Sequence, residues 1–182
     1  MVSGVTHFNR VSGIKGLYVG AKDLEIPIVS PEGLLLPLGV AGMTYFVDWN
    51  AGDDSKDGLS WETAFKTLAT AFAASSANIA SGPAGWAARN RIFIKGDTFE
   101  EDLVAFPQKT DVIGVGSYDS NSMPGITGCH APVADGTWGP RFINVWFLGK
   151  AAAEPIITLT NKTGGAQFIG CMFRQNTGNT SA

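Results

Sequence analysis

The stretch YFVDWNAGDDSKDGLSWETAFKTLATAF, residues 45–72, decides the fold of this chain. It opens with a β-type triplet, passes through a polar loop rich in Asp and Gly, and then changes to helical spacing. Ser60 suits an N-cap, so we expect a helix over about residues 60–77 that stops before Gly82. One apolar helix face is predicted from four residues at i, i+3, i+4 and i+7: Phe65, Leu68, Ala69 and Phe72.

Short apolar stretches punctuated by Gly and Pro follow the helix and predict strands. They cover residues 91–96, 102–107, 111–116, 142–148, 156–159 and 166–173. No helical crossover separates them, which argues against an ordinary parallel α/β sheet. Short turns without clear hairpin dipeptides fit either a β-sandwich or a coiled parallel solenoid.

Residues 45–68 resemble the opening of pectate-lyase-like β-helix proteins. In that family a YYVD strand leads into an Asp/Asn/Gly-rich loop ending in DGLSPETAF, and a short helix caps the first coil. Trp61 stands where the family usually has Pro. Residues 91–101 and 111–116 resemble the family's next two strands. The resemblance implies a mainly β chain that begins a right-handed parallel β-helix over residues 42–182.

A solenoid has an open apolar end, and a helix with one apolar face is suited to cover it. We therefore expect the helix to cap the first coil. At the other end, the last predicted strand runs into NTGNTSA, residues 176–182, with no obvious cap. Two explanations stay open: a very short β-helix covered by a partner, or a piece of a longer protein.

Residues 1–41 differ in pattern from the rest of the chain. They predict an arm of short strands, none of which is long enough to bury a face by itself. The stretches Phe8–Val11 and Gly16–Gly20 resemble attachment segments of bacteriophage fibre, spike and head-decoration proteins. The resemblance implies a virion component, usually a homotrimer, that binds other virion proteins through this arm. The arm residues expected to be buried against another chain are Phe8, Leu17, Tyr18 and Val19.

Composition excludes several classes of function. The 182 residues are 45% hydrophobic and 16% charged, with 23 Gly and a net charge of −3. Without clustered Lys or Arg to neutralise phosphates, we expect no nucleic-acid binding. Cys129 and Cys171 form no CxxC pair, so we expect apolar thiols in place of a zinc site. No signal peptide or bilayer-length apolar run is present, so we expect a soluble protein without membrane binding.

The acidic loop is the candidate metal site. Its oxygen-bearing side chains are Asp48, Asn50, Asp53, Asp54 and Asp57, close enough in sequence to suit Ca²⁺. The loop lacks EF-hand spacing and its terminal Glu. We therefore favour an Asx-turn loop whose side chains bond their own backbone, and we expect no cofactor.

Glu100, Glu101 and Asp102 form a carboxylate run, and paired carboxylates serve glycoside hydrolysis. Only Glu100 and Asp102 would share one face of a strand, and solvated edge charge is the favoured reading. His7 and His130 are isolated, so no hydrolase triad is predicted and no residue is assigned as catalytic.

Five tryptophans are present, and Trp138 and Trp146 are the candidate glycan contacts. Trp138 lies in a Gly/Pro-rich loop, which favours an exposed ring, although tryptophans more often fill cores or interfaces. Two hypotheses follow: a structural virion protein, or a carbohydrate-active β-helix enzyme (a polysaccharide lyase or depolymerase). A module that binds a host surface glycan is a third and weaker reading.

Overall fold

The computed structural model describes residues 40–81, 88–95, 98–116, 122–132, 137–151, 154–159 and 163–175. Contacts divide the chain into two units, Met1–Leu38 and Gly39–Ala182, and every described residue belongs to the second. Residues 1–39 of the expected arm therefore lie outside the described residues, and its last two residues begin the first strand.

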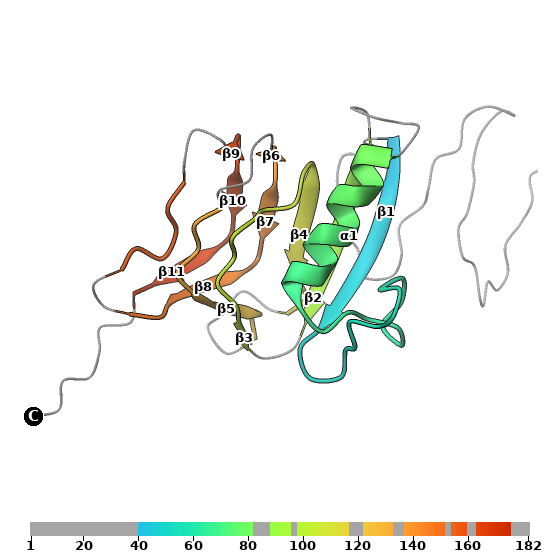
Figure 1. Ribbon diagram of the computed structural model, residues 1–182. Helices are drawn as coiled ribbons and strands as arrows, with labels where there is room; N and C mark the ends of the chain where they lie inside the picture. Colours follow the sequence, from blue (N-terminus) through green and yellow to red (C-terminus); the bar gives the residue numbers. More distant parts are fainter. Residues whose placement is uncertain are drawn as a thin grey trace, which may run out of the picture. The chain divides into compact units, whose positions relative to one another are not determined.

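The described residues form one helix and a series of short strands (Figure 1). The elements in chain order are β1 (Val40–Asp48), α1 (Leu68–Ser81), β2 (Ala88–Lys95), β3 (Thr98–Glu100), β4 (Thr110–Gly114), β5 (Gly125–Gly128), β6 (Thr137–Trp138), β7 (Arg141–Ile143), β8 (Trp146–Gly149), β9 (Thr163–Gly164), β10 (Gln167–Ile169) and β11 (Met172–Arg174).

The strands alternate between two all-parallel sheets. One sheet has five strands in the order β1-β2-β4-β7-β10, and the other has four in the order β11-β8-β5-β3. From β2 onward, successive strands of the chain fall in different sheets, and each pass stacks on the previous one in parallel register. A small third sheet pairs β6 with β9. This is the arrangement of a parallel β-helix, as predicted, and a sandwich is excluded because every pair is parallel.

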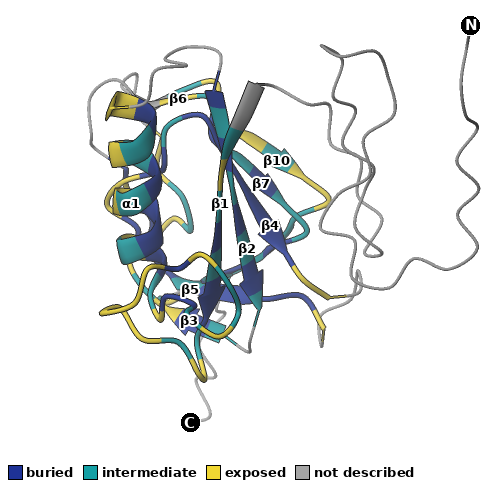
Figure 2. Cartoon of the chain, turned by 90° about the vertical axis from the view of Figure 1, so that its right-hand side faces the viewer, coloured by how far each residue is buried: buried dark blue, intermediate teal, exposed yellow. Residues whose placement is uncertain are grey.

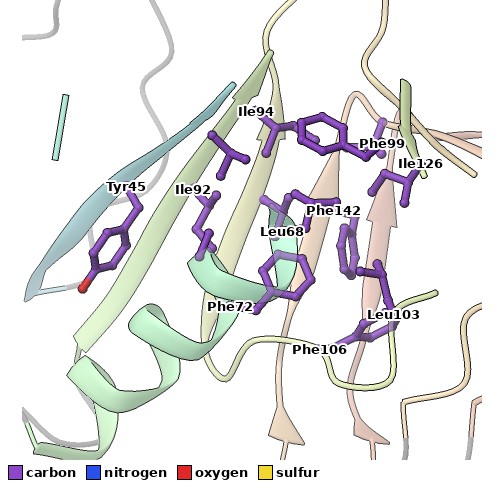
Figure 3. Close-up of a cluster of buried hydrophobic side chains, with 14 of the residues drawn as sticks. Tyr45, Leu68, Phe72, Ile92, Ile94, Phe99, Leu103, Phe106, Ile126 and Phe142 are labelled. Atoms are coloured by element: carbon purple, nitrogen blue, oxygen red, sulfur yellow. The ribbon is translucent and has the colours of Figure 1, made fainter. Parts of the chain in front are cut away.

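The core is a stack of inward side chains from the strands of successive coils, joined by the buried residues of α1 (Figure 3). Phe142 lies parallel to Phe168 with ring centroids 5.5 Å apart, and Phe147 lies parallel to Phe173 at 5.3 Å. Such ladders arise because parallel in-register strands place equivalent positions one above another. The last described coil leaves Phe173 half exposed.

Helix α1 begins at Leu68, eight residues later than the sequence suggested. Residues before it are held beside β1 instead, since Phe65 donates to the Phe46 carbonyl and Phe46 donates to the Gly58 carbonyl. The hydroxyl of Ser60 accepts the backbone N–H of Thr63 at 3.2 Å and so closes a turn, not the helix.

The helix also runs on to Ser81, past the expected end near residue 77, because Ala-rich sequence sustains a helix. Its buried residues are Leu68, Ala71, Phe72, Ser75 and Ile79. Ala69, expected on the apolar face, is exposed, and Phe65 is buried but precedes the helix. The buried face of α1 packs against the inner face of the five-stranded sheet and contacts β1 and β2 (Figure 2). This confirms that the helix caps the first coil.

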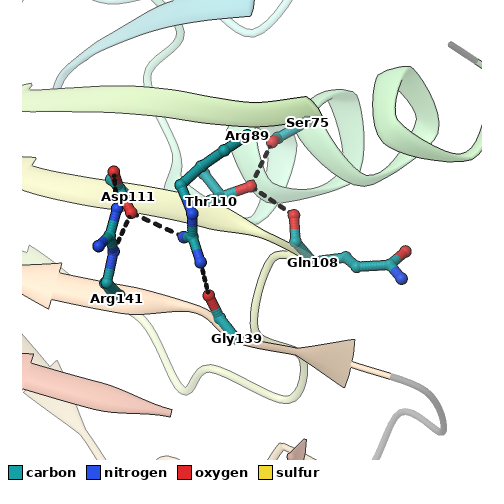
Figure 4. A network of polar contacts seen from close by, with 7 residues as sticks. All are labelled: Ser75, Arg89, Gln108, Thr110, Asp111, Gly139 and Arg141. Carbon is teal, nitrogen blue, oxygen red and sulfur yellow. Dashed lines mark hydrogen bonds and ion pairs between the residues drawn. The ribbon is translucent and has the colours of Figure 1, made fainter. Parts of the chain in front are cut away.

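A buried polar link joins α1 to the five-stranded sheet. The Asn90 amide nitrogen donates to the Ser75 carbonyl and hydroxyl oxygens, both at 3.0 Å. Ser75 in turn shares a 2.7 Å hydrogen bond with Thr110 (Figure 4). The Asn90 side-chain oxygen accepts the Met43 N–H at 2.7 Å. One buried asparagine thus ties the helix to two strands.

The expected strand over 102–107 is wrong. Leu103 and Phe106 are both buried, whereas Val104 is 66% exposed. Buried residues three apart do not fit the alternation of a strand, so this segment turns inward as a loop and β3 forms just before it.

The expected strands over 142–148 and 166–173 are each divided by a corner. Asn144 (φ 56°) separates β7 from β8, and Gly170 (φ 58°) separates β10 from β11. Glycine and asparagine tolerate this left-handed backbone better than other residues. In the region 156–159 the structure has only an isolated bridge between Ile157 and His130.

Candidate functional site

The carboxylate of Asp48 closes the start of the acidic loop. It accepts the backbone N–H groups of Asn50 and Ala51, each at 3.1 Å, and pairs with Lys95 at 3.0 Å. Burial alone would raise the pKa of Asp48, but the hydrogen bonds from Lys95, Ala51 and Asn50 together lower it. Asp48 therefore stays ionised and joins the end of β1 to β2.

The other loop carboxylates also bond the backbone. Asp53 accepts the N–H of Ser55 at 2.9 Å, and Asp57 accepts that of Leu59 at 3.0 Å. These are Asx turns, which fix the loop through its own side chains. Among the described residues, no group of three or more His, Cys, Asp or Glu side chains is arranged to hold a metal ion.

Asp54 and Glu101 together cap the start of α1. Asp54 accepts the N–H groups of Lys66 and Thr67, each at 2.9 Å. Glu101 reaches from the segment after β3 to the N–H groups of Leu68 (2.8 Å) and Ala69 (3.0 Å). The first N–H groups of a helix have no partner within it, so these two carboxylates satisfy them.

The three residues of the carboxylate run, Glu100, Glu101 and Asp102, consequently have different surroundings and different contacts. Glu100 is exposed at the end of β3. Burial raises the pKa of Glu101 despite its two helix contacts. Asp102 lies beyond the strand, accepts the Cys129 N–H at 2.9 Å and pairs with Lys150 at 3.3 Å. Glu100 and Asp102 therefore do not share the face of one strand.

Trp138 presents the most exposed indole of the described residues, 53% exposed on β6. A Cβ added to Gly164 on β9 would come within 2.6 Å of the Trp138 ring, so the ring rests against that glycine. Trp146 lies half-buried on β8, and its indole nitrogen is buried without a hydrogen-bond partner. The two candidate glycan contacts thus sit in different sheets and differ in exposure.

A cluster of charges that sequence reasoning missed lies next to Trp138. Asp111 is buried and accepts Arg89 at 2.7 Å and Arg141 at 2.6 and 2.7 Å (Figure 4). Arg89 also donates to the carbonyl of Gly139 at 2.9 Å. The hydrogen bond to Asp111 raises the pKa of Arg141. The cluster joins β2, β4 and β7 and connects them to Gly139, the residue that follows Trp138 and strand β6.

His130 is a second buried polar group outside any predicted site. Its Nδ1 accepts the Leu103 N–H at 3.2 Å, and its Nε2 is buried without a hydrogen-bond partner. Burial lowers the pKa of His130, which keeps the imidazole neutral. Its ring meets Phe147 edge-on at 5.6 Å, so it behaves as part of the core.

The candidate carboxylates and tryptophans of the described residues thus do not gather into one site. The four arm candidates, Phe8, Leu17, Tyr18 and Val19, lie outside the described residues. In the described part of the chain, no helix is long and apolar enough to cross a membrane. In comparison with known proteins, no family model, no curated protein and no solved structure matches the chain.

Proposed function

We propose that this chain is a structural component of a bacteriophage virion, built on a pectate-lyase-like β-helix. It would serve as a fibre, a tailspike base or a head-decoration protein, as a homo-oligomer. Residues 1–41 attach it to other virion proteins, and residues 42–182 form the projecting body. Support for the virion assignment comes from the resemblance of the two arm stretches to phage attachment segments.

The observation that carries the non-catalytic part of the proposal is the use of the carboxylates. Asp48, Asp54, Glu101 and Asp111 each hold backbone groups or basic side chains that join neighbouring elements. An acid or nucleophile acting on a sugar needs a carboxyl group free to face substrate. These four described carboxylates instead stabilise the stacked coils.

The virion assignment is tested on particles produced by the virus or prophage that encodes the chain. Mass spectrometry of gradient-purified particles should detect the chain, and antibodies raised against residues 40–175 should label the particle surface. A variant with Phe8, Leu17, Tyr18 and Val19 changed to Ser should fold but be lost from particles. Particles that assemble, infect and contain no copy of the chain would refute the proposal.

A glycan-binding module is the second candidate, and the exposed ring of Trp138 favours it. An indole that is 53% exposed offers the kind of surface on which sugar rings stack. Binding to a capsular glycan array should be lost in Trp138→Ala and kept in Trp49→Ala. If the wild type cleaves a polysaccharide and the Glu100→Ala/Asp102→Ala double variant does not, the result would instead support an enzyme.

A further inference from the structure

The outer face of the five-stranded sheet carries an unbroken apolar row. Residues Tyr45, Ile92 and Val112 point into the core, so their chain neighbours point to the opposite face. Strand register then places five of these outward residues side by side, one on each strand. Trp61 extends the row at β1, where it meets Phe46 edge-on at 4.8 Å. The outer apolar row consists of Trp61, Phe46, Phe93, Ile113, Ile143 and Ile169.

This row is unusual for a surface that faces water. Outward positions of a sheet with one buried face are normally polar. Here the outward row runs across all five strands, about 20 Å at the usual strand spacing. Phe46 and Phe93 stack at 5.8 Å, Ile113 is 5% exposed, and Ile169 is 47% exposed. Helix α1 lies on the other face of the sheet and does not cover the row (Figure 2). Ile113 is therefore covered, while the other members of the row are half-buried or exposed, and apolar surface left open in this way marks an interaction site.

The two flanks of the row differ in charge. On the side toward the strand starts, Arg91, Asp111 and Arg141 are in register, and Arg89 bonds to the same aspartate. That flank holds three arginines against one carboxylate.

On the side toward the strand ends, Asp48 pairs with Lys95 at 3.0 Å, and the Lys95 ammonium also lies 4.7 Å from the centre of the Trp61 ring, which the exposed Glu62 follows in the chain. That flank holds two carboxylates against one lysine. The row therefore lies between a basic flank and an acidic flank of the same chain.

We infer that the outer apolar row is the surface through which copies of this chain associate. In a ring of copies related by rotation, each molecule presents one flank to the next, so a basic flank meets an acidic one. The apolar rows then face one another and leave water. Opposite charges on the two flanks favour a second copy over a different partner, because one chain supplies both halves of the complementarity. The inference deepens the proposed oligomer by naming its interface.

The interface is tested by sedimentation velocity of the full chain over a range of concentrations. Wild type should sediment as an oligomer, and Ile143→Asp/Ile169→Asp should raise the dissociation constant at least tenfold. Val104→Asp is the matched control, because Val104 is 66% exposed on a loop away from this sheet, and it should leave association unchanged. Circular dichroism checks that each variant keeps its β signal.

A charge exchange tests the arrangement even if the aspartate variant unfolds. Arg91→Glu and Glu62→Arg should each weaken association, and the double variant should restore it, because the reversed flanks again attract. Restoration by the double variant supports the ring. A wild type that remains monomeric, or an oligomer indifferent to both sets of variants, overturns the interface. Either result leaves the virion proposal to the particle measurements, which do not depend on this face.

Discussion

Asn90 is the residue whose loss should show most clearly how α1 is attached to the β-helix. Strand β1 contains an irregularity between Ala41 and Thr44, where its register against β2 shifts. At this point the Met43 N–H donates to the Asn90 side-chain oxygen. Gly42 fits here because an added Cβ would come within 2.0 Å of the Arg89 carbonyl oxygen.

The cost of Asn90→Ala follows from these contacts. The Met43 N–H would lose its acceptor, which costs about 1–3 kcal/mol for a donor removed from water. The two bonds to Ser75 would also be lost, but the Ser75 hydroxyl keeps Thr110 as a partner. We therefore add only about 1 kcal/mol for them. The expected decrease in the free energy of unfolding is about 2–4 kcal/mol.

Urea denaturation followed by circular dichroism measures this decrease. Asn50→Ala is the control, since the Asn50 side chain is exposed in the acidic loop; it should change stability by less than about 0.5 kcal/mol. If Asn90→Ala were no more destabilised than Asn50→Ala, the polar link would not attach the helix. In that case apolar packing alone would hold α1.

Three further outcomes are expected. Glu101→Ala removes the acceptor of the Leu68 and Ala69 N–H groups and should lower stability by about 1–2 kcal/mol, seen as a lower urea midpoint; an unchanged midpoint contradicts the cap. Asn144→Ala loses two amide bonds at φ 56° and should cost about 1–3 kcal/mol in the same assay, more than Asn144→Gly, which tolerates the backbone; equal costs would exclude strain. The third concerns pH. His130 stays neutral when folded but takes a proton near pH 6.5 when unfolded, so its contribution to stability is complete above pH 6.5 and falls as the pH drops toward its lower native pKa. The raised pKa of Glu101 has the opposite effect, since it lowers the free energy of unfolding as the pH rises above about 4.5. The contribution of His130 is therefore isolated as the difference in free energy of unfolding between wild type and His130→Asn, followed from pH 7.5 to 5.5. A difference that does not change with pH refutes this account.

Local signals in the sequence, taken together with the family resemblance, were sufficient for the fold class. The apolar spacing of Leu68 and Phe72 placed a one-faced helix, and that face does cover the first coil. Strands without hairpin dipeptides or helical crossovers left a β-sandwich and a parallel solenoid open. The resemblance of residues 45–68 to pectate-lyase-like proteins favoured the solenoid, and both main sheets are parallel. These features depend on neighbours in the chain, which is why they can be read from the sequence.

The helix start and the short strand β3 were not predicted, because partners from elsewhere decide them. Phe65 looks helical by spacing, yet its N–H bonds to the edge of β1. Leu103 looks like part of a strand, yet His130 holds its backbone in a loop. A hydrogen bond to a distant residue can outweigh a weak local preference.

The chain's own sequence determined where apolar and polar residues alternate, and hence that coils form and a helix covers them. Only the tertiary structure decided which residues meet across those coils. Arg89, Asp111 and Arg141 come together, and Phe93 lies beside Ile113, because three strands far apart in sequence stack in one register. The register of the stacked strands depends on the number of loop residues in each coil, and no local pattern in the sequence encodes this loop length.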